Sequence, residues 1–343
     1  MDLSGKKKMK TNIKKLILLL ITVVFLYFVF VNLDIRELLS VIKGFDIKYA
    51  FFLSISILVS LSFRGLCFKQ LISKSVNAPL KDLVPLCISG AALNIVLPAR
   101  AGDFFRAYYV GHKYSMDKVK VFGAIMLERI FDGLAILFML FTAILLYNKN
   151  PLAQKLCIAA SAIFLASLLF AFLAFKYNKT DAICNFIQSK TEFLPEPLKN
   201  VVHSFISFVN KLCNSFVSGF EVLKYPKTLF NVMITAGIIW SFECLNYYFM
   251  ILGFNCDVNW SVVLFIISFI ALACMIPSTS IFVGPYQFAV IAAFAIYDIP
   301  KEMALAISLV EQAIVTIVTS IVATIFLIKN NITYKDLQED IQG

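Results

Sequence analysis

Long, uninterrupted apolar runs constrain this chain more than any other feature. Six of them cover residues 16–31, 49–66, 119–147, 156–175, 229–252 and 303–328. A helix rises about 1.5 Å per residue, so runs of this length suit a bilayer core about 30 Å thick. Only 15% of the 343 residues are charged and 60% are hydrophobic, too little polar surface for a soluble fold. The sequence predicts an all-α polytopic membrane protein with about six full spans.

Two further apolar regions, residues 83–110 and 262–297, are interrupted. Their breaks are marked by Pro98 and Gly102 in the first and by Pro277 and Gly284 in the second. Irregular backbone is tolerated at membrane depth only where protein or a water-filled cavity covers it. Both regions are therefore predicted to be re-entrant hairpins of broken helices, which enter and leave the membrane on the same side.

The net charge of +10 is interpreted as a signal of membrane orientation. With both regions as hairpins, most Lys and Arg residues fall on the side that holds both termini, as the positive-inside rule requires. If both regions instead crossed the membrane completely, only the loops between them would change sides. We expect the cytoplasmic (inner) membrane of a prokaryote, with both termini in the cytoplasm. No nucleic-acid partner is expected, and without Cys-x-x-Cys spacing or clustered histidines no metal or cofactor is expected either.

An internal repeat relates the two broken regions. Val84, Ser89 and Pro98 recur at a constant offset as Val263, Ser268 and Pro277, and Tyr114, Lys118 and Glu128 recur as Tyr297, Lys301 and Glu311. In the predicted topology the hairpins open to opposite sides, so the halves form an inverted repeat, a recurring design of secondary transporters. The chain then divides into a first membrane half (1–175), a linker (176–228), a second membrane half (229–328) and a cytoplasmic tail (329–343).

The linker contains apolar residues at helical spacing between Val201 and Phe220. This pattern predicts an amphipathic helix on the inner leaflet. A regulatory or gating role is the alternative.

Ionisable residues within predicted spans are costly and usually functional. Glu128 and Glu311 are both expected near the midplane, and Asp132 shares a helical face with Glu128. Arg64, Arg129 and Glu243 are the other charged residues of the spans. Two interpretations stay open: the charges neutralise each other as buried pairs, or one or both glutamates bind a proton or a cationic group during transport.

The first hairpin tip carries Arg100 and Arg106, and arginine suits bidentate capture of phosphate. A helix beginning after Gly102 would also point free N–H groups at an anion, with Asp103 as its predicted N-cap. Alternatively, the two arginines only orient the hairpin and touch bulk lipid headgroups.

These motifs carry a resemblance to a known family. The segment NIVLPARAGDFFRAYY, from Asn94, and the later Leu-Glu-Arg-x-x-Asp ending at Asp132 are similar to the transmembrane domain of lysylphosphatidylglycerol synthases, the flippase-like or UPF0104 family. Pro277, Gly284 and Pro285 resemble the family's Pro-x-x-x-Gly segment. The chain departs from the pattern at Gln287, where many members have Glu, which puts a charged role at that position in doubt.

The resemblance implies a domain that moves lipids between leaflets of the membrane. We expect an anionic or aminoacylated phospholipid or a polyprenyl-phosphate-linked lipid as its substrate. In the synthases this domain is fused to a soluble aminoacyltransferase, which is not expected in this chain, so no enzymatic activity is predicted. The alternatives are a noncatalytic membrane partner of a cell-envelope lipid synthase and, less favoured because no Asp-rich metal motif occurs, an enzyme that modifies lipid phosphate.

The residues expected to bind the lipid or to shape its path come from both halves. They are Arg64, Asn94, Pro98, Arg100, Gly102, Asp103, Arg106, Glu128, Arg129, Asp132, Pro277, Gly284, Gln287 and Glu311.

Overall fold

The computed structural model describes residues 28–29, 31, 33–97, 100–146, 217–256, 258–273 and 284–332, with single positions between 155 and 215. These residues form helices and connecting turns, and none of them lies in a strand. Most of the predicted spans 16–31 and 156–175, most of the linker, and residues 333–343 of the tail lie outside the described residues.

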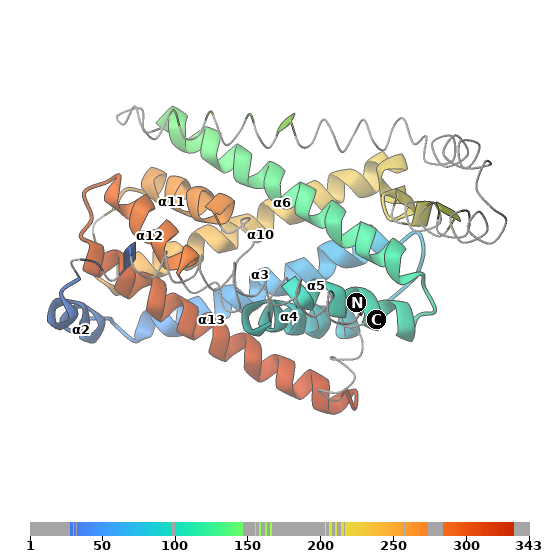
Figure 1. Cartoon of the computed structure of the whole chain (residues 1–343), viewed down its shortest axis with the longest axis horizontal. Coiled ribbons are helices and arrows are strands. Elements are labelled where there is room, and N and C mark those ends of the chain that lie inside the picture. The colour runs from blue at the N-terminus through green and yellow to red at the C-terminus, as the bar shows by residue number, and fades with distance from the viewer. Residues whose placement is uncertain are drawn as a thin grey trace, which may run out of the picture.

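Within the described part of the chain, four helices are long and apolar enough to cross a membrane. They are α3 (Lys48–Ile72), α6 (Lys118–Leu146), α10 (Pro226–Gly253) and α13 (Lys301–Lys329). Figure 1 shows them running along the length of the molecule. They confirm the predicted spans 49–66, 119–147, 229–252 and 303–328.

Both predicted interruptions separate pairs of short helices. The first pair is α4 (Leu80–Val96) and α5 (Ala101–Lys113), and the second is α11 (Trp260–Ala273) and α12 (Pro285–Ala295). The first pair lies toward one end of α6 and the second toward the other (Figure 1). Phe104 of α5 accordingly stacks on Phe122 near the start of α6, whereas Phe265 of α11 packs with Leu140 and Ala143 near its end.

The first break is a change of backbone conformation at Leu97 and Arg100. Leu97 is extended, as expected of a residue before proline, and Arg100 is left-handed with φ 54°. The helix begins at Ala101, so the prediction of Asp103 as its N-cap is wrong. Asp103 lies within the first turn, where its carboxylate contacts arginines of α5 and α6 instead of free backbone N–H groups.

Corresponding positions in the two copies of the predicted repeat have similar local structure. Ser89 and Ser268 are both fully buried and donate hydrogen bonds to the carbonyl four residues earlier. The helices that start at Lys118 and Lys301 both have 29 residues. The duplication and its inverted arrangement stay predictions.

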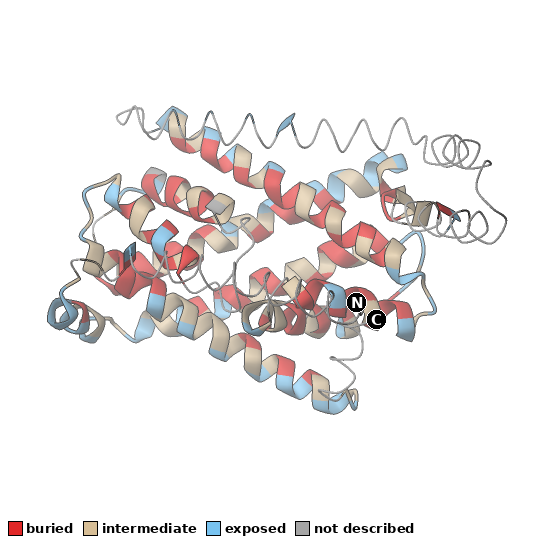
Figure 2. Ribbon diagram, viewed as in Figure 1, coloured by how far each residue is buried: buried red, intermediate tan, exposed pale blue. Residues whose placement is uncertain are grey.

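The distribution of side chains suits a membrane. Large apolar residues on the long helices are exposed, including Phe138, Phe141, Phe230 and Ile325. Polar and charged residues lie inside, among them Ser60, Asp103, Glu128 and Asn246. Figure 2 shows buried and exposed residues mixed along each helix, as expected when one face packs on protein and another meets lipid.

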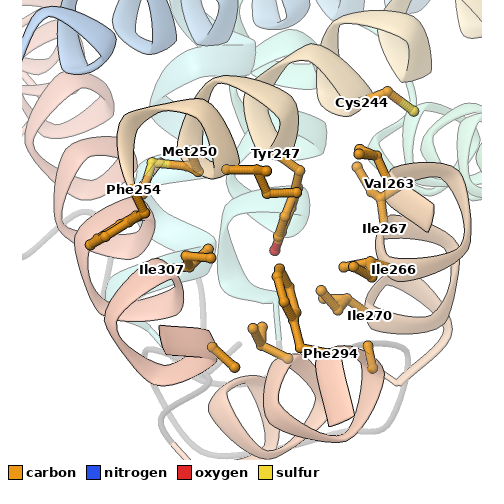
Figure 3. Packing of buried hydrophobic residues seen from close by; sticks show 14 of the residues in the cluster. Cys244, Tyr247, Met250, Phe254, Val263, Ile266, Ile267, Ile270, Phe294 and Ile307 are labelled. Atoms are coloured by element: carbon orange, nitrogen blue, oxygen red, sulfur yellow. The ribbon is translucent and has the colours of Figure 1, made fainter. Parts of the chain in front are cut away.

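Two apolar clusters hold the helices together. One surrounds the contacts of α3, α4, α5 and α6 and includes Phe68, Leu83 and Ile125. The other fills the junction of α10, α11, α12 and α13, where Met250, Ile266 and Phe294 meet (Figure 3). Tyr247 points into this second cluster (Figure 3).

A short helix, α2 (Ile35–Lys43), was not predicted from the sequence. Asp34 caps it by accepting hydrogen bonds from the N–H groups of Arg36 and Glu37. It packs on α13, and the carboxylate of Glu302 accepts a hydrogen bond from the Asp34 N–H. Its nine residues are too few for an apolar pattern to distinguish a helix from a loop in the sequence.

Helices α4 and α5 approach most closely at Gly90 and Gly102. A Cβ atom on Gly102 would lie 1.9 Å from the carbonyl oxygen of Gly90, a backbone atom that cannot move aside. Glycine is therefore needed at this contact, as at other close helix crossings in membranes.

We expect Gly102→Ala to destabilise the protein by at least about 1–3 kcal/mol, the usual cost of overpacking. Thermal unfolding in detergent measures the effect. Gly237→Ala is the matched control, because its Cβ would meet nothing within 4 Å. An unchanged Gly102→Ala variant would contradict the close contact.

Candidate functional site

Three helices bring six predicted site residues into one buried ion-pair network. They are Arg64 on α3, Asp103 and Arg106 on α5, and Glu128, Arg129 and Asp132 on α6. The three arginines balance the three carboxylates. Because an isolated charge is costly in a low-dielectric interior, this balance permits all six to stay ionised.

The pair of Arg106 and Glu128 forms the centre of the network. The guanidinium donates two hydrogen bonds to the carboxylate, from Nη1 to Oε1 at 3.2 Å and from Nη2 to Oε2 at 2.7 Å. Both side chains are at most 2% exposed. The ring of Phe68 covers the guanidinium, with its centroid 4.3 Å from Cζ. The carboxylate of Glu128 and the ring of Phe68 therefore both hold the Arg106 side chain in place.

The other two arginines link this pair to its neighbours. Arg64 Nη1 contacts Glu128 at 3.1 Å and Asp132 at 2.8 Å. Arg129 is shared among Asp103, Glu128 and Asp132 at 2.9–3.3 Å, and its side chain is 26% exposed. Arg129 is thus the most accessible arginine of the network. The predicted mutual neutralisation of these charges is present in the structure.

A cavity of about 270 Å³ adjoins the network. Its walls carry Arg64, Arg100, Arg106 and Arg129, together with Asn94, Asp103 and Glu243. Four cationic groups therefore face two carboxylates. Four buried polar atoms of its lining have no hydrogen-bond partner: Asn94 Oδ1, Asp103 Oδ2, Arg106 Nε and Arg129 Nε. Buried polar groups of this kind are available to bind water or a ligand.

A second, apolar cavity of about 700 Å³ lies between α6, α10 and α11. Phe131, Phe138, Trp240 and Leu264 contribute to its walls. Trp240 Nε1 also donates a hydrogen bond of 2.9 Å to Asp132 Oδ1. Trp240 thus joins the apolar cavity to the ion-pair network. The sequence held no signal for this cavity, because its walls come from segments far apart in the chain.

The remaining predicted site residues of the second half lie in a different cluster. Glu311 accepts a 2.6 Å hydrogen bond from Tyr286, and it makes no ion pair with the described arginines of the network. Gln287 is 3% exposed; its Oε1 accepts from the Gly284 N–H and its Nε2 donates to Gln312. A neutral amide at position 287 therefore holds the start of α12. Pro98 and Pro277 lie outside the described residues.

Sequence reasoning missed several polar residues beside these clusters. Trp240, Asn246, Tyr247 and Tyr286 were not singled out, and Glu243 was noted without a role. Glu243 lies close enough to both Arg64 and Glu311 to interact with them electrostatically. Only the helix packing reveals this connection.

The open end of the first hairpin carries a polar contact outside the four long helices. Asp82 Oδ2 accepts from Lys113 Nζ at 2.8 Å and from the Tyr114 hydroxyl at 2.7 Å. Partial burial disfavours the charged carboxylate, but these two hydrogen bonds outweigh it and hold the pKa of Asp82 below its ordinary value. The contact ties the start of α4 to the end of α5.

The fold and the site define a polytopic α-helical membrane protein with an arginine-lined cavity between broken and continuous helices. A family model described as "Lysylphosphatidylglycerol synthase TM region" matches residues 15–323. The chain belongs to this family, as the sequence resemblance predicted.

Two curated relatives come from Methanocaldococcus jannaschii. The UPF0104 membrane protein MJ1595 is 24% identical over 343 aligned residues, which cover 94% of this chain and 97% of that protein. The UPF0104 membrane protein MJ1078 is 25% identical over 232 residues, which cover 65% of this chain and 87% of that protein. No solved structure matches the chain.

The Asp82 contact gives a prediction for the pH dependence of stability. Because the pKa of Asp82 is lowered in the folded protein, its contribution is present above the unfolded value of about 3.9 and is lost as the pH falls through the folded value. We expect Asp82→Asn to cost about 1 kcal/mol or less at pH 7, since both partners are partly exposed. Thermal unfolding between pH 7 and pH 3 should show this difference closing, with Glu37→Gln as an exposed control; a constant difference would contradict the assignment.

The Arg106–Glu128 pair gives a double-mutant prediction. We expect Arg106→Met and Glu128→Met each to cost roughly 3–5 kcal/mol, because each leaves a buried charge with fewer partners. The double variant should lose less than the sum of the two, by about 1–3 kcal/mol. Unfolding of all four proteins in one detergent measures the coupling, and strict additivity would contradict it.

Proposed function

We propose that this protein moves a lipid with an anionic headgroup between the two leaflets of the cytoplasmic membrane, and that it is not itself an enzyme. The single observation that carries the proposal is the cavity inside the helix bundle whose walls hold four arginines and two carboxylates. The proposal places both termini in the cytoplasm and requires no cofactor.

The chemistry of the cavity favours phosphate as the bound group. Guanidinium groups match phosphate oxygens in geometry and charge, and such charge-assisted hydrogen bonds are stronger than neutral ones. Arg106 Nε and Arg129 Nε are buried donors without partners. The volume of about 270 Å³ equals that of roughly nine liquid waters, which suits a headgroup and excludes whole acyl chains.

The neighbouring apolar cavity supports an amphiphilic substrate. Its walls are apolar, and Trp240 connects it to the charged network through Asp132. An arrangement of one charged and one larger apolar compartment matches the two parts of a lipid. The acyl chains need not enter the charged cavity for the headgroup to reach the arginines.

The ion-pair network offers a way to bind and release the headgroup. Arg129 divides its contacts among three carboxylates and is partly exposed, so a phosphate can replace one carboxylate as its partner while each carboxylate keeps a contact with Arg64 or Arg106. Arg106 is held by Glu128 through Nη1 and Nη2 and positions the network. Movement of the hairpin α4–α5 against α6 would then carry the headgroup, as broken helices do in other transporters.

The family description narrows the class of lipid. The matched family is named for lysylphosphatidylglycerol synthases, whose lipid product carries an amine as well as a phosphate. Glu243 in the cavity wall supplies a carboxylate that an ammonium group can contact. We therefore propose an anionic or aminoacylated phospholipid, or a polyprenyl-phosphate-linked lipid, as the substrate.

Lipid analysis of the purified protein tests headgroup binding. We expect one anionic lipid to be enriched over the bulk membrane by mass spectrometry, and Arg129→Gln or Arg100→Gln to reduce that enrichment about tenfold, the effect of losing one charged hydrogen bond. Arg36→Gln on the exposed face of α2 is the matched control. If the lipid is still enriched in both cavity variants, the arginines serve only to orient the hairpin in the membrane.

Translocation is then measured in vesicles with the enriched lipid in fluorescent form. We expect transport by the wild type and the Arg36→Gln control, and at least a tenfold loss in Arg129→Gln. A protein that binds the lipid, moves none of it and co-purifies with a lipid synthase would instead be a noncatalytic partner of that enzyme. Chemical conversion of the lipid by the purified chain alone would indicate an enzyme.

A further inference from the structure

Two glutamates inside the helix bundle lack a cationic partner. Glu243 on α10 and Glu311 on α13 form no ion pair with a Lys or Arg of the described residues, unlike Asp103, Glu128 and Asp132. The two carboxylates are connected through neighbouring side chains: Tyr247 lies one helical turn after Glu243 on α10, and its hydroxyl contacts that of Tyr286, which donates to Glu311. Like charges facing one another at membrane depth are unfavourable unless a positive charge lies with them.

Neutral polar groups surround Glu243. The Ser60 hydroxyl donates to its Oε1 at 2.6 Å, and Asn246 Nδ2 donates to its Oε2 at 3.1 Å. Asn246 is only 2% exposed, and its Oδ1 oxygen is buried without a hydrogen-bond partner. The amide that lies against Glu243 therefore presents an unused acceptor, the kind of atom that a bound cation or its water would satisfy.

A chain of hydroxyl groups leads to Glu311. Tyr286 donates its one hydroxyl proton to Glu311 Oε2 at 2.6 Å. The 2.7 Å contact between the hydroxyls of Tyr247 and Tyr286 must then use the proton of Tyr247. Two hydroxyl groups, on α10 and α12, thus direct their dipoles at the carboxylate on α13. Hydrogen bonds in such chains strengthen each other.

The charged and titratable groups that face this pair come from three helices. Arg64 on α3 interacts with Glu243 over a longer distance but is held by Glu128 and Asp132. Tyr247 on α10 and Tyr286 on α12 are neutral donors. Among the described residues neither carboxylate forms an ion pair with a Lys or Arg, although Glu243 shares a cavity wall with four arginines.

We propose that Glu243 and Glu311, with the Oδ1 oxygen of Asn246, form a binding site for one monovalent cation from the aqueous phase, either a proton or an alkali ion. The site lies beside the charged cavity, because Glu243 is part of that cavity's wall. Binding of the cation there does not depend on lipid transport. Its use as the coupling ion of transport rests on the proposed function.

Infrared difference spectroscopy of the full chain in phosphatidylcholine vesicles tests the site. At pH 7 in choline chloride we expect an absorption band from one protonated carboxyl group. Glu311→Gln and Glu243→Gln should each remove it, whereas Glu37→Gln, the exposed control, should leave it unchanged. Tyr286→Phe should shift the band without removing it, because the Tyr286 hydroxyl positions Glu311 and does not carry the bound charge.

Replacing choline by sodium distinguishes the two sources of positive charge. Loss of the band, together with saturable binding of radioactive sodium that is reduced at least tenfold in Glu311→Gln, identifies an alkali ion. A band that sodium does not change identifies a proton. If the wild type shows neither the carboxyl band nor saturable sodium binding, the site does not exist.

Transport measured on the same variants separates this inference from the proposed function. Cation binding in a protein that moves no lipid would overturn the transport proposal and leave the site intact. Wild-type transport rates in both Glu243→Gln and Glu311→Gln would overturn coupling while leaving the transporter intact. Loss of transport in Glu311→Gln, a residue outside the lining of the charged cavity, with enrichment of the lipid unchanged, is the result that we expect for a coupled carrier.

Discussion

Burial of the ionised Arg106 side chain is the constraint on which the rest of the first half depends. An unpaired guanidinium is very costly in a low-dielectric interior, so Arg106 requires Glu128 on the neighbouring helix and the ring of Phe68 beside it. Glu128 also forms an ion pair with Arg64 of α3. The position of α5 between α4 and α6 follows from these contacts, together with the glycine contact that lets α5 lie close to α4.

The structure contains two chemically different cavities, one lined by arginines and one apolar, and a pair of carboxylates, Glu243 and Glu311. The arginine-lined cavity and the apolar cavity meet at the hydrogen bond between Asp132 and Trp240, which makes that contact the boundary between charged and apolar surfaces. Glu243 extends the charged region toward Glu311 in the second half. Charge therefore continues from one half of the bundle to the other, through helices that are far apart in sequence. A carrier that exchanges partners among fixed charges needs a continuous polar region of this kind within the membrane.

Much of the fold was predictable because its main determinants are local. Apolar runs of sufficient length predicted α3, α6, α10 and α13, and proline with glycine predicted both breaks. The spacing of Glu128 and Asp132 placed both on one face, and both contact Arg64 as that spacing allows. The role of Asp103 was predicted wrongly because a capping residue and an ion-pair residue have the same local sequence, and the choice depends on Arg129 from another helix. Helix α2 was missed because its pattern is short.

The sequence by itself determined that the chain lies in a membrane, where its helices are interrupted and which ionisable residues are buried, since each of these follows from hydrophobicity and backbone chemistry within a few neighbouring residues. Tertiary structure alone decided which charges pair. Arg64 forms an ion pair with Glu128. Among the described residues, Glu311 accepts a hydrogen bond from the Tyr286 hydroxyl and forms no ion pair. The two cavities were likewise set by packing. Pairing depends on distances between side chains of separate helices, and in a medium of low dielectric a difference of a few ångströms decides whether a carboxylate is neutralised by an arginine.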